Sequence, residues 1–132
     1  MKLTNNEIYS YAGLLNQYFG PECTVKFPIK INFFLQKNIE TLTNAAQEIE
    51  KARLKIAQDY GVLTEDGTGY SIPDDKLEEA QSQLNELFGL EQHLKIKRFS
   101  IEDFNNVELS TAETAALMFM IKDLDIEDDE DW

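Results

Sequence analysis

The chain has 132 residues and a formal net charge of −13, with 42% hydrophobic and 11% aromatic residues. This size and composition predict one globular domain with a real core, and the negative charge disfavours direct binding to nucleic acid or to an anionic membrane, which carry charge of the same sign. No apolar run approaches the roughly 20 residues that span a bilayer, and residues 1–6 lack the apolar run of a signal peptide, so we expect a soluble cytoplasmic protein.

The first predicted element is a helix over residues 5–19. Thr4-Asn5-Asn6-Glu7 has the pattern of a capping box, in which Thr4 caps the helix and Glu7 is its third residue. The apolar residues that follow at helical spacing are Ile8, Tyr11, Leu14, Leu15 and Tyr18. Gly20-Pro21 ends the helix, and residues 24–27 are predicted as a short strand.

A long second helix is predicted from Pro28 to Tyr60, a stretch with no internal glycine or proline. Two columns repeat every seven residues, Leu35, Leu42, Ile49, Ile56 and Ile39, Ala46, Arg53, Tyr60. They form a heptad-like seam on a helix on the order of 45 Å long. Such a seam has to be covered by other parts of this chain or by a second copy, so the long helix is a candidate oligomerisation element.

A β-hairpin and a third helix are predicted next. Gly61 caps the long helix, and Asp66-Gly67 indicates a two-residue turn between strands at 62–64 and 70–72. Pro73-Asp74-Asp75 opens a helix that Gly89 ends. Its expected apolar stripe is Leu77, Ala80, Leu84, Leu87 and Phe88. This helix folds back antiparallel on the long one, with the β-hairpin at the tip of the pair.

The last part of the chain is predicted to hold a strand and two short helical segments. Leu94 and Ile96 alternate with polar residues as in a half-buried strand, with His93 on the solvated side. Capping boxes begin at Ser100 and Ser110. The second opens a helix that runs through residue 121 and is apolar on all sides, which predicts burial in the core more than cover by a partner.

The expected fold is therefore α+β and mainly helical. It is built on a long antiparallel helical hairpin with a small β-hairpin at its tip, plus short strands and a buried C-terminal helix. Residues 1–122 form the single globular domain, and residues 123–132 form an acidic flexible tail, because seven carboxylates oppose the negative end of the last helix dipole.

Several motifs carry a resemblance that covers most of the chain except the acidic tail. They are Lys2-Leu3-Thr4-Asn5-Asn6-Glu7, Gln36-Lys37-Asn38, Ile49-Glu50 with Ala52-Arg53, Tyr60-Gly61, Asp66-Gly67, Leu84 to Glu91 and Leu117-Met118-Phe119-Met120-Ile121. Together they resemble a small family of uncharacterised proteins encoded by tailed phages and prophages of Gram-positive bacteria. The resemblance implies a place in the bacterial cytoplasm and one of two jobs, interference with a host protein or assembly of the virion. It implies no catalytic residue, because these motifs are structural.

No motif indicates enzymatic chemistry or a cofactor. Cys23 and His93 are the only cysteine and histidine, so a zinc site built mainly from Cys and His lacks ligands. We expect Cys23 to be a small buried hydrophobe and not a nucleophile. Gly67-Thr68-Gly69 lacks the lysine and helix of a phosphate loop. The acidic tail lacks the glycine and the final glutamate of a calcium loop, so no metal is expected.

The excess negative charge lies in two blocks. Residues 61–92 carry eight acids and only Lys76 as a base, and residues 123–132 carry seven acids and no base. A uniformly solvated surface does not require this segregation, so both blocks are candidate contact surfaces for another protein. The predicted partner-binding residues are Glu78, Glu79, Glu86, Asp128, Asp129, Glu130, Asp131 and Trp132.

The leading hypothesis is a non-enzymatic protein-binding module encoded by a phage. It inhibits a protein of the bacterial host, an antiviral defence factor, by steric occlusion with an acidic surface. The alternative is a structural or accessory protein of virion morphogenesis or of the tail, in which the heptad-like seam joins several copies. The acidic tail either binds a partner or only keeps the protein in solution.

Overall fold

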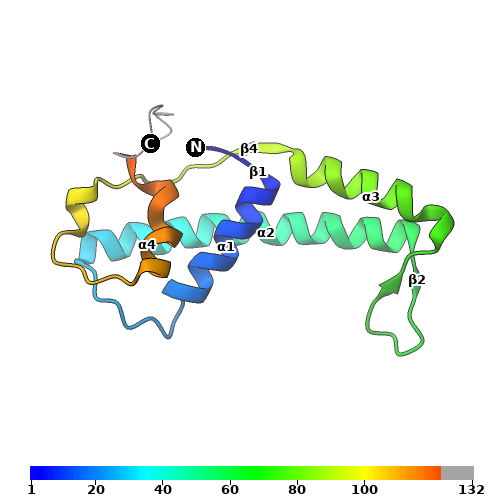
Figure 1. Cartoon of the computed structure of the whole chain (residues 1–132), viewed down its shortest axis with the longest axis horizontal. Coiled ribbons are helices and arrows are strands. Elements are labelled where there is room, and N and C mark those ends of the chain that lie inside the picture. The colour runs from blue at the N-terminus through cyan, green and yellow to red at the C-terminus, as the bar shows by residue number, and fades with distance from the viewer. Residues whose placement is uncertain (123–132) are drawn as a thin grey trace.

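A computed structural model describes residues 1–122 and has the expected α+β, mainly helical fold (Figure 1). In chain order the elements are β1 (Lys2–Thr4), α1 (Asn5–Phe19), α2 (Ile29–Tyr60), β2 (Val62–Leu63), β3 (Tyr70–Ser71), α3 (Asp74–Gly89), β4 (Glu91–His93), the 3-10 turn η1 (Ile101–Phe104), α4 (Thr111–Leu117) and the 3-10 turn η2 (Met118–Met120). Within residues 1–122 the helices are too short or too polar to cross a membrane.

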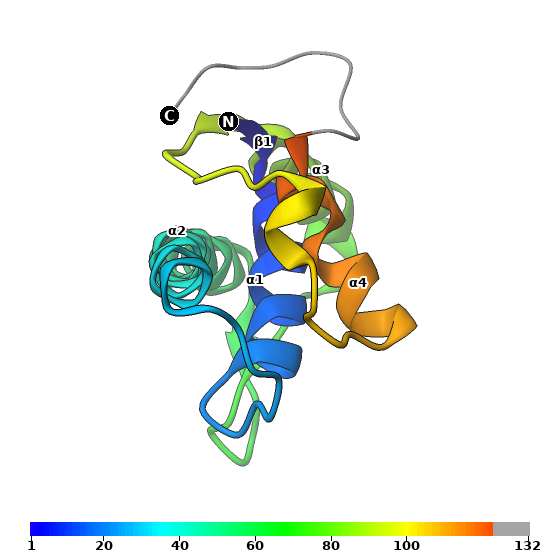
Figure 2. The same ribbon diagram turned by 90° about the vertical axis from the view of Figure 1, so that its left-hand side faces the viewer.

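The long helix α2 is the axis of the molecule. Its N-terminal half belongs to the larger part of the molecule, here called the body, which is the described chain outside residues 50–89. In the body, α1 lies between α2 and α4 (Figure 2). Its C-terminal half pairs with α3, which runs back along it, and the β2–β3 hairpin stands at the far end (Figure 1). This is the predicted antiparallel helical hairpin with a β-hairpin at its tip.

The seam of α2 is covered by the same chain. Leu35, Leu42 and Ile49 are buried, whereas Ile56, beyond the body, is only half-buried. The other members of the core come from α2 itself and from residues 1–3, α1, residues 96–99 and residues 116–121. These three residues of the seam therefore offer no surface to a second copy of the chain. They give no support to the prediction of oligomerisation through the long helix, which stays a prediction.

The α1 helix begins as predicted. The side chain of Thr4 accepts from the backbone N–H of Glu7 at 3.1 Å, and the Glu7 carboxylate accepts from the backbone N–H of Thr4 at 2.9 Å. These reciprocal bonds satisfy two donors that the first helical turn cannot pair internally. The face buried against α2 and α4 is Ile8, Ala12, Leu15 and Phe19.

Two of the predicted strands are wrong. Residues 24–27 have no regular secondary structure and pair with no strand among the described residues. The strand near Leu94 and Ile96 lies earlier, at β4, where it pairs antiparallel with β1. After Leu94 the chain stays extended, but its backbone bonds the side chain of Asn38 on α2 in place of a neighbouring strand.

The β2–β3 hairpin forms, but not through a two-residue turn. Leu63 pairs with Tyr70, so six residues connect the strands, and Gly67 has a positive φ of 73°. Asp66 explains the longer loop. Its carboxylate accepts from the hydroxyl of Thr64 at 2.6 Å and from the backbone N–H of Thr68 at 3.1 Å. These bonds lower the pKa of Asp66 to about 2 and close an Asx-type turn inside the loop.

The stripe predicted on α3 is wrong at Leu77. Ala80 is buried and Leu84, Leu87 and Phe88 are half-buried, but Leu77 is 51% exposed. Leu77 and Phe88 are eleven residues apart, about three helical turns, so they lie on the same flank of α3. The ring of Tyr9 on α1 packs edge-on against Phe88, with 5.7 Å between the ring centroids. α1 contacts α3 at the end nearest the body and does not extend as far as the end that holds Leu77 (Figure 1).

The C-terminal helix is shorter and more exposed than predicted. The capping box at Ser110 forms, but the α-helix ends at Leu117 and tightens to the 3-10 turn η2. Leu117 and Met120 are buried, whereas Met118 is 50% exposed. The tighter turn brings Ile121 into a parallel bridge with Phe99, which a continuous α-helix could not form.

Candidate interaction surface

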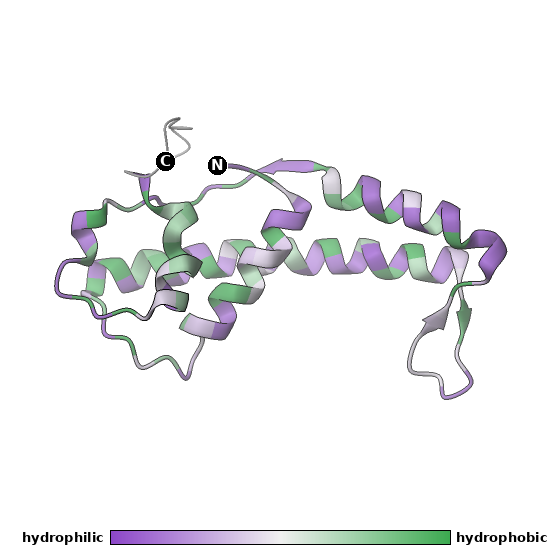
Figure 3. Cartoon of the chain, in the orientation of Figure 1, coloured by the Kyte–Doolittle hydropathy of each residue, from purple (hydrophilic) through white to green (hydrophobic). Residues whose placement is uncertain are grey.

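The half of the molecule beyond the body is an arm, defined as residues 50–89. The fully buried core of α2 ends at Ile49, and Ala80 is the only fully buried residue of α3. The arm therefore consists of two helices that cover one another on one side, with the hairpin at its end, and hydrophilic residues alternate with hydrophobic ones along both helices (Figure 3). Most of the acidic block at residues 61–92 lies on it.

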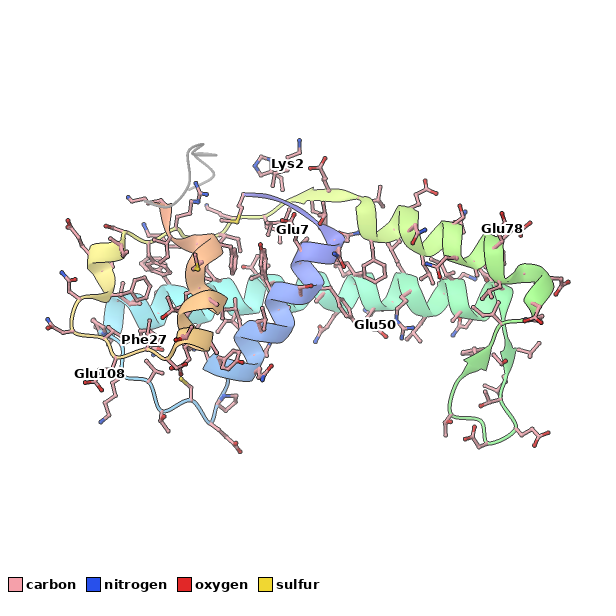
Figure 4. The ribbon with its side chains drawn as sticks, viewed as in Figure 1. Lys2, Glu7, Phe27, Glu50, Glu78 and Glu108 are labelled. Atoms are coloured by element: carbon pink, nitrogen blue, oxygen red, sulfur yellow. The ribbon has the colours of Figure 1, made fainter. Side chains whose placement is uncertain are left out.

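The predicted carboxylates of α3 are on the solvent side of the arm. Glu78, Glu79 and Glu86 are all exposed, and Glu78 points away from α2 (Figure 4). Glu79 and Glu86 are seven residues apart, so they share a face of α3 at a spacing of about 10 Å along the helix. Asp74 and Asp75 occupy the first turn, where negative charge is favourable to the helix dipole.

Five large apolar side chains of the arm are exposed, and none of them belongs to the contact residues that the charge pattern predicted. They are Leu54 on α2, Val62 and Leu63 on β2, Tyr70 on β3 and Leu77 on α3. Val62 and Leu63 are successive residues of one strand and point to opposite sides, yet they are 59% and 60% exposed. The hairpin therefore has no buried face, which its position beyond the helix pair explains.

The junction between arm and body is held by a polar cluster that the sequence did not reveal. Glu50 accepts a hydrogen bond from the hydroxyl of Tyr9 on α1 at 2.8 Å and pairs with Arg53 one turn along α2. These two donors lower the pKa of Glu50 to about 2, with Arg53 as the larger cause. Glu50 is thus charged at neutral pH and lacks the raised pKa of a general acid.

A cleft of about 700 Å³ lies between the end of α1, residues 20–28 and the first turns of α2. Its apolar wall includes Phe19 and Phe27, and its polar lining includes Asn32 and Lys26. Cys23 lines it and is half-buried, so the expectation of a fully buried cysteine is wrong. Among residues 1–122 the lining has no carboxylate, so the described lining offers no acid–base pair of the kind that hydrolytic chemistry uses.

The remaining predictions concern His93, metal binding and the acidic tail. His93 is exposed on β4, as expected, opposite Lys2 of β1. Within residues 1–122 no three His, Cys, Asp or Glu side chains lie close enough together to hold a metal ion. Asp128, Asp129, Glu130, Asp131 and Trp132 lie outside the described residues.

Comparison with known proteins adds no relative: no protein-family model, curated protein or solved structure matches the chain.

Proposed function

We propose that this chain is a protein-binding module and that the solvent side of its arm is the docking surface. The observation that carries the proposal is the exposure of large apolar side chains at the far end of the arm, among them Leu63 and Leu77, within the acidic block. Apolar anchors inside a charged rim are the usual composition of a protein–protein contact.

The partner that fits this surface has an apolar recess surrounded by Lys and Arg. The net charge of residues 61–92 is −7, which favours fast, salt-sensitive association with such a surface. The arm is long and narrow, so its tip can enter a cleft that a globular body could not reach (Figure 1). On this proposal the module acts by occluding the cleft.

The resemblance to phage proteins leads us to propose a protein of the bacterial host, an antiviral defence factor, as the occluded partner. The alternative, a component of the virion, relied on the heptad-like seam as an oligomerisation element. Because Leu35, Leu42 and Ile49 pack inside this chain, that seam gives the alternative no support. The part of residues 123–132 in partner binding stays a prediction.

The test compares tagged variants of the full chain as bait in infected cells. The arm variants are Leu63→Ser with Leu77→Ser, and Glu78→Lys with Glu79→Lys. The matched controls are Met118→Ser, which is 50% exposed on the body, and Glu108→Lys, an exposed carboxylate far from the arm (Figure 4). Mass spectrometry should identify a protein retained by the parent and the controls and lost with both arm variants.

The retained protein is then purified and titrated with each variant. Its affinity should fall at least tenfold for either arm variant, and the charge variant should also flatten the dependence on salt. A retained protein that binds parent, arm variants and controls equally would refute the arm as the docking surface. A bait that retains no protein above background would refute the binding function itself.

A further inference from the structure

Half of the basic residues of this acidic chain lie in two segments that contain no acidic residue. Residues 23–39 contain three of the 12 Lys and Arg residues, and residues 92–101 contain three more. The fold places these segments side by side. The Asn38 side chain of α2 donates to the backbone O of Lys97 and accepts from its backbone N–H, both at 2.9 Å. The two basic segments therefore meet where Asn38 contacts Lys97.

Aromatic side chains lie among these charges. Lys30, Phe33, Phe34 and Lys37 recur at three- and four-residue spacing, so they share one face of α2. The ammonium group of Lys37 lies 5.5 Å from the ring centroid of Phe33, and that of Lys97 lies 5.5 Å from the ring of Phe34. Phe33 is 56% exposed. We call this surface the basic–aromatic face, defined as Lys30, Phe33, Phe34, Lys37, Lys95 and Lys97.

The acidic residues that flank the two basic segments in the chain are Glu22, Glu40, Glu91 and Glu102. Glu40 is exposed one turn after Lys37 on α2. On η1, Glu102 is exposed and Asp103 already accepts from the backbone N–H of Ser100 at 2.9 Å. The face thus has the composition of a site for an acidic segment that also carries apolar side chains.

The chain itself supplies such a segment next to the face. Residues 123–132 carry seven carboxylates and no base, together with Leu124, Ile126 and Trp132. Their starting point is fixed, because the backbone N–H of Lys122 donates to the backbone O of Phe99 at 2.9 Å, two residues from Lys97. Ten residues reach at most about 35 Å, whereas Lys30 and Lys37 are about 10 Å apart along α2.

We propose that residues 123–132 bind the basic–aromatic face of their own chain. Attachment beside the face gives the segment a high effective concentration there, which makes up for ion pairs that are individually weak. The carboxylates meet the lysines and the apolar side chains meet the phenylalanine rings. The bound segment neutralises the positive charge of this face, so that the acidic arm dominates the electrostatic field of the protein. This contact is independent of the arm's proposed role.

Trp132 is the only tryptophan, so its fluorescence reports the contact without a label. In the full chain at low salt, its emission should be shifted to the blue of a synthetic peptide of residues 123–132, and acrylamide should quench it less. Both differences should vanish in about 1 M NaCl, where the Debye length is ~3 Å. Emission and quenching identical to those of the peptide at low salt would overturn the proposal.

Charge-reversed variants locate the contact. Lys30→Glu with Lys37→Glu should give the fluorescence of the free peptide, while Lys51→Glu, an exposed lysine on the same helix outside the face, should behave as the parent. Circular dichroism checks that each variant keeps its helices. If the two reversals leave the fluorescence unchanged in a folded protein, the segment does not bind this face. The parent signal should not depend on protein concentration, since a concentration-dependent shift would identify a second copy as the binder and overturn the intramolecular contact.

Discussion

Removing the side chain of Asn38 should show how much a single long-range contact contributes to stability, apart from the stability of the helix that contains it. It is 1% exposed on α2 and bridges the backbone N–H and C=O of Lys97, with a further contact of 3.5 Å from its amide to the sulfur of Met120. On either side of Lys97, the extended segment is held by backbone bonds from Leu94 to Met1 and from Phe99 to Met120. Asn38 therefore fixes the middle of this segment to the long helix.

Asn38→Ala leaves two backbone groups of Lys97 without their partner. Each buried group left unpaired costs about 1–3 kcal/mol, and the gain in helix propensity from Asn to Ala returns up to about 0.7 kcal/mol. We expect a loss of about 2–5 kcal/mol in the free energy of unfolding. For a domain of this size that corresponds to a fall in melting temperature of roughly 6–20 °C.

The matched control is Asn44→Ala, an exposed asparagine on the same helix. It has the same gain in propensity and loses no buried hydrogen bond, so it should change stability by less than about 1 kcal/mol. Urea and thermal unfolding, followed by circular dichroism, measure both variants. Hydrogen exchange should show faster exchange at the Lys97 amide in Asn38→Ala alone. Equal stability of the two variants would refute the bridging role of Asn38.

Two further predictions follow from the core and from the junction of the arm. Leu42→Ala and Ile49→Ala should each lower the free energy of unfolding by about 2–5 kcal/mol, because both side chains are buried. Leu54→Ala is the control, since Leu54 is 40% exposed and its loss should lower stability far less. Melting curves that do not rank the three variants in this way would contradict the place of the seam in the core. The pKa of Glu50 is lowered to about 2 from 4.5, so its stabilisation is present above about pH 4.5 and is lost as the pH falls through 2. Because the pair is partly exposed, parent and Glu50→Gln should differ by about 1 kcal/mol or less at pH 7 and converge near pH 2, and a difference that is independent of pH would count against it.

The sequence by itself determined the features that depend on neighbours in the chain. The capping boxes at Thr4, Ser100 and Ser110 form as predicted, because each pairs groups three residues apart. The span of α2 and the antiparallel return of α3 followed from the apolar periodicity and from the absence of glycine and proline between Pro28 and Tyr60. The exposure of Glu78, Glu79 and Glu86 followed from the same periodicity.

Only the tertiary structure decided the features that depend on which segments meet. Leu77 has the spacing of a core residue but is 51% exposed, whereas Phe88 at the other end of α3 is covered by the ring of Tyr9. Periodicity could not show that an asparagine side chain would hold the segment after β4 in place of a strand. Nor could it show that two basic segments, about 60 residues apart in the chain, would lie side by side. Periodicity gives the face of an element, whereas burial and charge clustering depend on what packs against that face.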